Sequence, residues 1–392
     1  MDIYIFGAGR VGELLLRRLR KENKLIHGFC VSNIDTNMNE VDGKPVVSVD
    51  QLVEESERVQ LYIAVLERGE KTIEKELRAK GFKNIVPLDE SVLEQDDFSE
   101  HRKKAPIIEV TVQMGCSVNC RYCPQETLLH SYYKQDTRRQ SKMSFGEYKV
   151  YLDMLPYNCI LDFSGFAEPF LNSEAIEMME YADEQNREMT LFTTLQGLDM
   201  GGLKRIINLQ FSYVVLHVAD IDGFSRIPVT AEYLEMLDYI IQMKKKDGRP
   251  FVDSANCQSQ PSREVLAVTN GKLRIYCEMQ DRAGNLENDD HSLSFGNQSG
   301  ELYCDRAVNT DHFVLLPDGT VVLCCNDYGM QHVLGNLKNQ SYEDIIHGEP
   351  FLNVKRAMHI DESLPLLCRK CMYAKSVVKN VYNKETVKGL IE

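Results

Sequence analysis

Three cysteines of this chain are close enough in sequence to bind one inorganic cluster. Cys116, Cys120 and Cys123 form a CxxxCxxC pattern within residues 115–124. Three soft thiolates on one short loop can hold three corners of a cubane [4Fe–4S] cluster, and they leave the fourth iron without a protein ligand. Structural zinc normally uses four ligands in CxxC pairs. The pattern therefore favours an iron–sulfur centre with one reactive iron, and the alternatives are structural zinc or a chance grouping.

The loop resembles the hallmark of the radical S-adenosylmethionine (SAM) superfamily, in which an aromatic residue, here Tyr122, precedes the last cysteine. The resemblance extends over residues 106–371, roughly two-thirds of the chain. It implies that the open iron chelates the amino and carboxylate groups of SAM. It also implies that one electron cleaves SAM to methionine and a 5′-deoxyadenosyl radical, which makes the protein a hydrogen-abstracting enzyme.

Two further segments are similar to parts of the same superfamily. The sequence SGFAEP looks like its Gly-Gly-Glu region, which implies that Gly165 and Glu168 receive the methionine ammonium, although Ala167 stands where glycine is usual. A carboxylate suits this role because an ammonium offers only hydrogen-bond donors. By the same resemblance, Thr193 and Thr194 are expected near the SAM ribose. The alternatives are a solvated acid for Glu168 and ordinary turn residues for the threonines.

A second set of cysteines follows downstream, spaced C-x19-C and then CxxC: Cys304, Cys324, Cys368 and Cys371. Four thiolates can close a tetrahedral site for zinc or ligate a [4Fe–4S] cluster fully. The set resembles the SPASM-type extension of many radical SAM enzymes, which implies iron–sulfur. Because no denser run of cysteines follows Cys371, we expect one auxiliary [4Fe–4S] cluster. Cys325 is an alternative ligand to Cys324.

The elements expected to position these residues alternate between strands and helices. Candidate strands recur at the ~25–30-residue spacing of βα units. They span residues 107–114, 159–163, 189–193, 213–218 and 272–277, with helices near 144–155, 174–186 and 231–246. Each candidate residue follows a strand, as do His217 and Asp220, and the loops after the strands of a (β/α) barrel assemble its active site. The pattern predicts an α/β protein with a partial, TIM-like barrel over residues 106–300.

The N-terminal segment predicts a separate domain. Strands at residues 3–6, 25–31, 61–65 and 85–88 with a helix at 70–80 indicate a Rossmann-like parallel α/β domain over residues 1–90, followed by a linker at 91–105. Gly7, Gly9 and Gly12 form GxGxxG between a strand and a helix, where backbone amides can bind a phosphate. The alternative is a tight turn needed only for packing. The domain is loosely similar to nucleotide-sugar-associated domains of sugar-modifying proteins.

Residues 301–392 are predicted to form the auxiliary cluster domain. Within it, residues 312–316 and 320–323 flank the turn Pro317-Asp318-Gly319 and predict a β-hairpin.

Composition narrows the possible partners. The 392 residues include 59 acidic and 45 basic side chains, a net charge of −14 that repels phosphate backbones and anionic lipid, so we expect neither nucleic acid nor membrane as a partner. No apolar run reaches the ~20 residues of a membrane span. The start of the chain lacks the features of a secretory signal, and the 12 cysteines are bunched, so we expect a reducing, cytoplasmic location.

These features predict a radical SAM oxidoreductase or isomerase that receives its electron from a donor such as flavodoxin or ferredoxin. The substrate we favour is a carbohydrate or nucleotide-linked sugar, undergoing dehydrogenation or epimerisation. Arg282 is a candidate for an anionic substrate group, and Cys257 or Cys277 for returning a hydrogen atom. The alternatives are a maturase of ribosomally made peptides and a non-enzymatic, zinc-stabilised binding protein.

Overall fold

The computed structural model describes residues 1–8, 10–32, 40–64, 67–87, 105–134, 136–277, 279–286, 298–307 and 311–376. Gly9 and, apart from Ala105, the predicted linker at 91–105 lie outside these residues. The chain divides into two compact units, Met1–Lys104 and Ala105–Glu392. The predicted boundary at residue 300 within the second unit stays a prediction.

The first unit has a mixed sheet in the order β3-β4-β2-β1-β5-β6. All neighbours pair in parallel except β3 and β4. The parallel α/β fold predicted for this segment is therefore confirmed, with the Rossmann-like feature that the first strand lies between the second and a later one. Its elements are β1 (Asp2–Phe6), α1 (Arg10–Lys21), β2 (Ile26–Val31), β3 (Glu40–Val41), β4 (Lys44–Ser48), η1 (Val49–Glu55), β5 (Val59–Ile63), α2 (Glu67–Ala79) and β6 (Asn84–Val86).

Gly7, after β1, and Gly12, in the first turn of α1, are required by the local backbone and its packing. Gly7 has φ +108°, a region that side chains other than glycine rarely adopt, and its amide donates to the carbonyl of Cys30 at 2.9 Å. A Cβ on Gly12 would lie 2.1 Å from the carbonyl oxygen of Gly7. The start of α1 can therefore approach the end of β1 only without a side chain at position 12. Phosphate binding by this turn stays a prediction.

The second unit contains a nine-stranded sheet, in the order β12-β11-β10-β9-β8-β7-β14-β15-β16. Six strands from β7 to β12 lie side by side in chain order and pair in parallel. This is the predicted partial barrel of βα units. The strands are β7 (Ile107–Val110), β8 (Ile160–Phe163), β9 (Met189–Thr193), β10 (Phe211–His217), β11 (Ser254–Cys257) and β12 (Ile275–Cys277).

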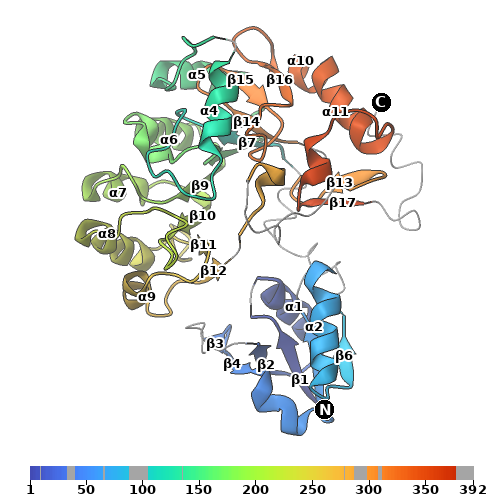
Figure 1. Cartoon of the computed structure of the whole chain (residues 1–392). Helices are drawn as coiled ribbons and strands as arrows, with labels where there is room; N and C mark the ends of the chain where they lie inside the picture. Colours follow the sequence, from blue (N-terminus) through green and yellow to red (C-terminus); the bar gives the residue numbers. More distant parts are fainter. Residues whose placement is uncertain are drawn as a thin grey trace. The chain divides into compact units, whose positions relative to one another are not determined.

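Helices cover one face of these parallel strands. Figure 1 shows α5 to α9 as an outer layer along the strands, in chain order. Ser144, Thr230 and Ser262 cap the starts of α5, α8 and α9 by accepting hydrogen bonds from backbone amides, which satisfies donors that a helix N-terminus leaves unpaired. The helices are α4 (Gln125–Tyr133), α5 (Phe145–Met154), α6 (Ala175–Glu184), α7 (Met200–Ile206), α8 (Ala231–Gln242) and α9 (Arg263–Thr269).

The predicted C-terminal hairpin is present and continues the same sheet. Strand β14 (His312–Leu315) pairs in parallel with β7, and β15 (Thr320–Val322) and β16 (Val333–Asn336) follow antiparallel. Consequently the downstream cysteine region is joined to the barrel by backbone hydrogen bonds. The other elements are β13 (Leu302–Cys304), α10 (Tyr342–Ile346), α11 (Glu349–His359), η6 (Leu367–Lys370) and β17 (Ala374–Ser376), with β13 and β17 forming a two-stranded sheet.

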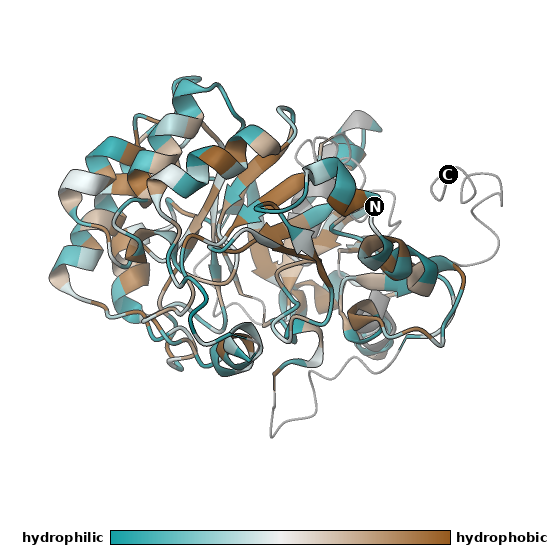
Figure 2. Cartoon of the chain, turned by 90° about the horizontal axis from the view of Figure 1, so that it is seen from above, coloured by the Kyte–Doolittle hydropathy of each residue, from teal (hydrophilic) through white to brown (hydrophobic). Residues whose placement is uncertain are grey.

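One large hydrophobic core holds the second unit together. It includes Leu161 and Leu191 of the parallel strands and Leu315 and Val354 of the C-terminal part. Figure 2 shows the strands as largely hydrophobic, whereas the helices carry both hydrophilic and hydrophobic residues. Within the described part of the chain, no helix combines the length and the apolar character needed to cross a bilayer.

We expect Gly12→Ala to lower the stability of the first unit by about 1–3 kcal/mol, because the new methyl group overlaps the Gly7 carbonyl. The loss of stability would be measured by urea unfolding, with limited proteolysis as the readout. The matched control is Gly146→Ala, the same exchange near the start of α5, where a Cβ meets nothing within 4 Å. Equal stability of the two variants would contradict the packing role.

Candidate active site

The three-cysteine loop opens onto a cavity at the C-terminal ends of the parallel strands. Cys116, Cys120 and Cys123 all line this cavity of about 190 Å³, here called the strand-end cavity. The loop is tightly turned, since Asn119 has φ +50° and the amide of Cys123 donates to the carbonyl of Cys120 at 3.1 Å. Three half-buried thiols facing one cavity fit three corners of a cubane cluster.

Polar groups surround the thiols of this loop. The side-chain amide of Gln125 donates to Cys123 Sγ at 3.3 Å, and the Tyr328 hydroxyl lies 3.4 Å from the same sulfur. Burial raises the pKa of Cys116, and it raises that of Cys120 to about 12. These thiols therefore keep their protons at neutral pH until a metal displaces them. Hydrogen bonds to cluster sulfurs are one means by which proteins tune such centres.

The predicted Tyr122 also lines the cavity. Its side chain is 7% exposed, and the Arg282 guanidinium lies 5.7 Å from the centre of its ring, within the range of a cation–π interaction. The structure thus places Arg282, which the sequence offered only as a candidate for an anionic group, beside the cysteine loop.

Glu168 is held by a dense set of hydrogen bonds. It follows β8, precedes the short helix η3 (Pro169–Leu171) and is 5% exposed. Thr193 Oγ1 donates to its Oε1 at 2.7 Å, while the hydroxyl and the amide of Thr194 each donate to its Oε2 at 2.6 Å. Burial raises the pKa of Glu168, and these hydrogen bonds act in the opposite direction. The carboxylate is therefore fixed in orientation at the cavity wall.

These contacts give the two threonines a role that the sequence did not indicate. They were expected near a ribose, but they bind Glu168, and of the two only Thr194 lines the strand-end cavity as described. A hydroxyl that donates to a buried carboxylate is committed to that bond, since a hydroxyl has one hydrogen. Their shared partner lies 25 residues away in sequence, so local patterns could not reveal it.

Gly165 has a steric reason to be glycine. Its φ is +72°, and a Cβ there would lie 2.1 Å from Thr111 Oγ1. That hydroxyl accepts the amide of Phe166 at 3.1 Å and fixes the turn after β8. The turn brings Ala167 and Glu168 to the cavity surface, and Gly165 lines it too.

A wall of polar side chains lines the same cavity along the ends of β10, β11 and β12. His217, Gln258, Gln280 and Arg282 each have a buried side-chain atom without a hydrogen-bond partner among the described residues. Those atoms are His217 Nδ1, Gln258 Oε1, Gln280 Oε1 and Arg282 Nε. Burial, with Arg282 nearby, lowers the pKa of His217 to about 4, so this imidazole is neutral at physiological pH. We call these four residues the polar wall.

The backbone at Arg282 is strained. Arg282 and Ala283 have φ of +51° and +53°, and Asp281 supports them by accepting the amide of Ala283 at 3.0 Å. Consecutive non-glycine residues in this region cost about 1–3 kcal/mol each, a cost that concentrates at functional sites. The strain is consistent with a requirement to place the guanidinium in the cavity.

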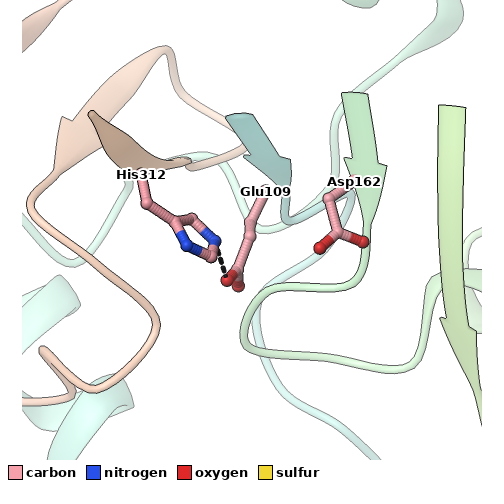
Figure 3. A group of neighbouring side chains, drawn as sticks. All are labelled: Glu109, Asp162 and His312. Atoms are coloured by element: carbon pink, nitrogen blue, oxygen red, sulfur yellow. Dashed lines mark ion pairs between the residues drawn. The ribbon is translucent and has the colours of Figure 1, made fainter. Parts of the chain in front are cut away.

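A buried ionic group that the sequence analysis missed lies between neighbouring strands (Figure 3). Glu109 on β7, Asp162 on β8 and His312 on β14 are 3%, 2% and 5% exposed, with potential ligand atoms within 4.8 Å of one another. His312 Nε2 lies 2.5 Å from Glu109 Oε1. Burial alone would raise the pKa of Glu109, but His312 and then Arg306 lower it. A charged residue within the apolar run Ile107–Val110 was the available signal.

The second cysteine set lines a separate cavity of about 50 Å³, which we call the cysteine cavity. Its members are Cys304, Cys324, Cys368 and Cys371. They come from β13, the segment after β15, and η6 with the residue that follows it. The Asn326 amide donates to Cys371 Sγ at 3.7 Å. Four thiols around one small cavity fit a fully ligated metal centre.

Cys325 is distinguished from Cys324 by its neighbours. Cys325 lines both cavities, and Arg306 donates to its sulfur at 3.9 Å. Burial raises the pKa of both thiols, but the charges that act on Cys325 come chiefly from Glu109 and Arg306, whereas those on Cys324 come from other cysteines. This environment supports Cys324 as the fourth ligand.

Cys257 and Cys277 do not reach the strand-end cavity. Asn256, Gln258 and Tyr276 line it, and successive side chains of a strand point to opposite faces of the sheet. The two thiols therefore point away from the cavity, which argues against either one returning a hydrogen atom to a substrate inside it.

Comparison with known families agrees with this arrangement. Residues 304–372 match the model of the SPASM family, an iron–sulfur cluster-binding domain. All four cysteines of the cysteine cavity fall within the match, and the strand-end cavity contains the CxxxCxxC thiols. The match identifies residues 304–372 as a SPASM iron–sulfur cluster-binding domain. The four thiols of the cysteine cavity therefore fit an iron–sulfur cluster.

Solved structures similar to this chain include BtrN in complex with AdoMet and 2-DOIA, which is 16% identical with a TM-score of 0.47, over 71% of this chain and 98% of that chain. Streptococcus suis SuiB bound to precursor peptide SuiA is 12% identical with a TM-score of 0.45, over 78% and 82% of the two chains. Native anSMEcpe with bound AdoMet and Kp18Cys peptide is 14% identical with a TM-score of 0.39, over 68% and 87%. No curated protein matches the chain.

We expect Cys324→Ala to lower the iron content of anaerobically reconstituted enzyme from about eight to about four atoms per chain, because one [4Fe–4S] cluster loses a ligand. The matched control is the neighbouring substitution Cys325→Ala, which should keep about eight. Iron and sulfide quantitation would measure both. Loss of iron in the Cys325 variant alone would reverse the ligand assignment.

Proposed function

We propose that the chain is a radical SAM enzyme that abstracts a hydrogen atom from a polyhydroxylated small molecule, a carbohydrate or nucleotide-linked sugar. It would dehydrogenate or epimerise this substrate. The observation that carries the proposal is the polar wall, which shares one cavity with the three-cysteine loop. A substrate bound between them would lie beside the site of radical formation.

Cys116, Cys120 and Cys123 would hold the reactive cluster, and Glu168 would receive the ammonium of SAM. The bound cofactors supply one chemistry, the reductive cleavage of SAM to a 5′-deoxyadenosyl radical. Thr193 and Thr194 keep the Glu168 carboxylate oriented by donating to both of its oxygens. Because these donors are already in place, an incoming ammonium would meet a preorganised acceptor.

The polar wall supports a substrate rich in hydroxyl groups. Buried polar atoms without partners cost about 1–3 kcal/mol each, and a ligand that pairs with them recovers this free energy. Amide oxygens of Gln258 and Gln280 can accept from hydroxyls, and Arg282 Nε can donate. A hydroxyl can do both, which suits a wall of mixed donors and acceptors.

Arg282 further supports an anionic group on that substrate, such as a phosphate of a sugar nucleotide. A guanidinium is always charged and presents its donors in a fork that matches phosphate and carboxylate oxygens. Among the described residues, Arg282 has no carboxylate within ion-pair distance, although Cys123, Cys325 and Tyr328 lie near enough to affect it. Its charge is therefore available to a ligand.

We expect the combined variant Cys116→Ala, Cys120→Ala and Cys123→Ala to lose SAM cleavage while keeping the iron of the auxiliary centre. The loop thiols are the ligands of the reactive cluster, and the cysteine cavity is separate. The measurement is 5′-deoxyadenosine formation by chromatography together with iron quantitation. Cleavage of SAM by this variant would remove the assignment of roles to the two cysteine sets.

Substrate class can be tested by incubating the enzyme with sugar nucleotides, sugar phosphates and the peptide encoded by a neighbouring gene. Deoxyadenosine formation that depends on a sugar supports the proposal. Formation that depends only on the peptide identifies a peptide maturase instead.

With an active sugar in hand, we expect Gln258→Leu to raise KM about tenfold or more, because the leucine cannot pair with a substrate hydroxyl. The matched control is Gln210→Leu, since Gln210 is exposed and directly precedes β10, at the opposite end of the strands. Steady-state kinetics of both variants would measure the effect. An unchanged KM for Gln258→Leu would place the substrate elsewhere in the cavity.

A further inference from the structure

Two cysteines lie directly opposite each other at the ends of neighbouring strands. Cys257 ends β11, Cys277 ends β12, and the two residues are partners in the parallel register of these strands. Neighbouring strands lie about 4.8 Å apart. A disulfide needs Cα atoms about 4.4–6.8 Å apart, so the backbone positions are compatible with a covalent link between the two sulfurs.

The two thiols differ sharply in their access to solvent. Cys257 is 1% exposed, and its sulfur lies 4.0 Å from the carbonyl oxygen of Ala219. Cys277 is exposed and lies on β12, a strand at the edge of its sheet. A dissolved reagent can therefore reach Cys277 directly, and it can reach Cys257 only through Cys277 or after the strands separate.

The pKa values of the two thiols are shifted in opposite directions. A hydrogen bond from Cys257 lowers the pKa of Cys277, against a smaller opposing effect of burial. The same hydrogen bond, together with burial and the negative charge of Asp220, raises the pKa of Cys257. The exposed sulfur is thus the one favoured as thiolate, and the thiolate is the nucleophile in thiol–disulfide exchange.

We propose that Cys257 and Cys277 form a redox-active pair, in which Cys277 is the site of modification by a small disulfide such as glutathione disulfide and Cys257 is the resolving thiol. The proposal does not depend on the substrate of the enzyme. It rests on the register of β11 and β12 and on the opposite exposure of the two thiols.

The chemistry proceeds in two exchanges. The Cys277 thiolate attacks one sulfur of glutathione disulfide, breaks its S–S bond, forms a mixed disulfide and releases one glutathione thiolate. Cys257 then attacks the Cys277 sulfur, forms the protein disulfide and releases the second glutathione, which takes the proton of Cys257. Two protein thiols are oxidised, and one glutathione disulfide is reduced to two glutathione molecules.

The pair is adjacent to the polar wall. Gln258 follows Cys257 directly, and Asn256 and Tyr276 flank the two thiols on the cavity face of the strands. A covalent link would restrain the two strand ends that carry these side chains. Oxidation is therefore positioned to act on the substrate side of the strand-end cavity, while the cysteine loop follows a different strand.

The test uses the full chain with its clusters reconstituted under anaerobic conditions, treated with glutathione disulfide, alkylated with N-ethylmaleimide and digested for mass spectrometry. We expect a cross-linked peptide containing Cys257 and Cys277 that disappears after treatment with dithiothreitol. Iron quantitation before and after treatment identifies any sample in which the cluster ligands were oxidised instead.

Two serine variants separate the roles of the thiols. In Cys257→Ser, the mixed disulfide with glutathione should accumulate at Cys277, because no resolving thiol remains. In Cys277→Ser, Cys257 should stay unmodified, like the buried Cys30 and Cys159. The exposed position of Cys277 makes its serine variant compatible with folding even where the substitution at Cys257 is not.

Three results would overturn the proposal. One is a wild-type enzyme that stops at the mixed disulfide, which would show that Cys257 does not resolve it. Another is modification of Cys277 no faster than that of the buried Cys30 and Cys159. The last is modification of Cys257 in the Cys277→Ser variant, which would show that access does not run through Cys277.

Discussion

Parallel pairing of six consecutive strands is the constraint on which the site depends. Because β7 to β12 run in one direction in chain order, their carboxyl ends meet along one edge of the sheet. The cysteine loop follows β7, and Glu168 follows β8. Thr193 ends β9, and Thr194 follows it. Within the polar wall, His217 ends β10, Gln258 follows β11, and Gln280 and Arg282 come after β12. Residues as distant in sequence as Cys116 and Arg282 thereby share one cavity, as in other barrels whose active sites form at strand ends. A change of register in any strand would turn its side chains to the opposite face.

Some polar groups of this cavity have partners, whereas others have unpaired atoms. Glu168 accepts hydrogen bonds from Thr193 and Thr194, at the end of β9, and Glu109 pairs with His312 from the strand that extends the sheet. The low dielectric of a protein interior strengthens the hydrogen bonds and ion pairs of such groups. It also raises the free-energy cost of a buried polar group that has no partner. The polar wall, with its unpaired atoms, is consequently the part of the cavity where a ligand gains most from binding. Burial of ionic groups here serves to orient them, since paired buried charges add little net stability.

Features formed by residues close together in sequence could be predicted, whereas contacts between residues far apart in sequence could not. The cysteine loop could be recognised because its three cysteines lie within eight residues. Strand β9 was predicted at its observed bounds, Met189–Thr193, because it is a short apolar and β-branched run. Strand β11, with the sequence Ser-Ala-Asn-Cys, was missed because polar and small residues give no strand signal. The Glu109–His312 pair and the threonine contacts to Glu168 were missed because each joins separate strands. Long-range pairs of this kind arise from topology, which local patterns do not encode.

The ends of β11 and β12 carry residues of the strand-end cavity on one face and the Cys257–Cys277 pair on the other. Successive side chains of a strand point to opposite faces of the sheet. At these strand ends, Asn256 and Tyr276 therefore face the cavity, and the cysteine pair lies on the other face. A side chain on one face cannot move its backbone without moving its neighbour on the other, since consecutive residues share a peptide plane. Strand β12 lies at the sheet edge and is held by backbone pairing on one side only among the described strands, so it is the parallel strand that yields most readily to such a displacement. Among the described cysteines, Cys277 alone is exposed, and it directly follows Tyr276, which lines the strand-end cavity.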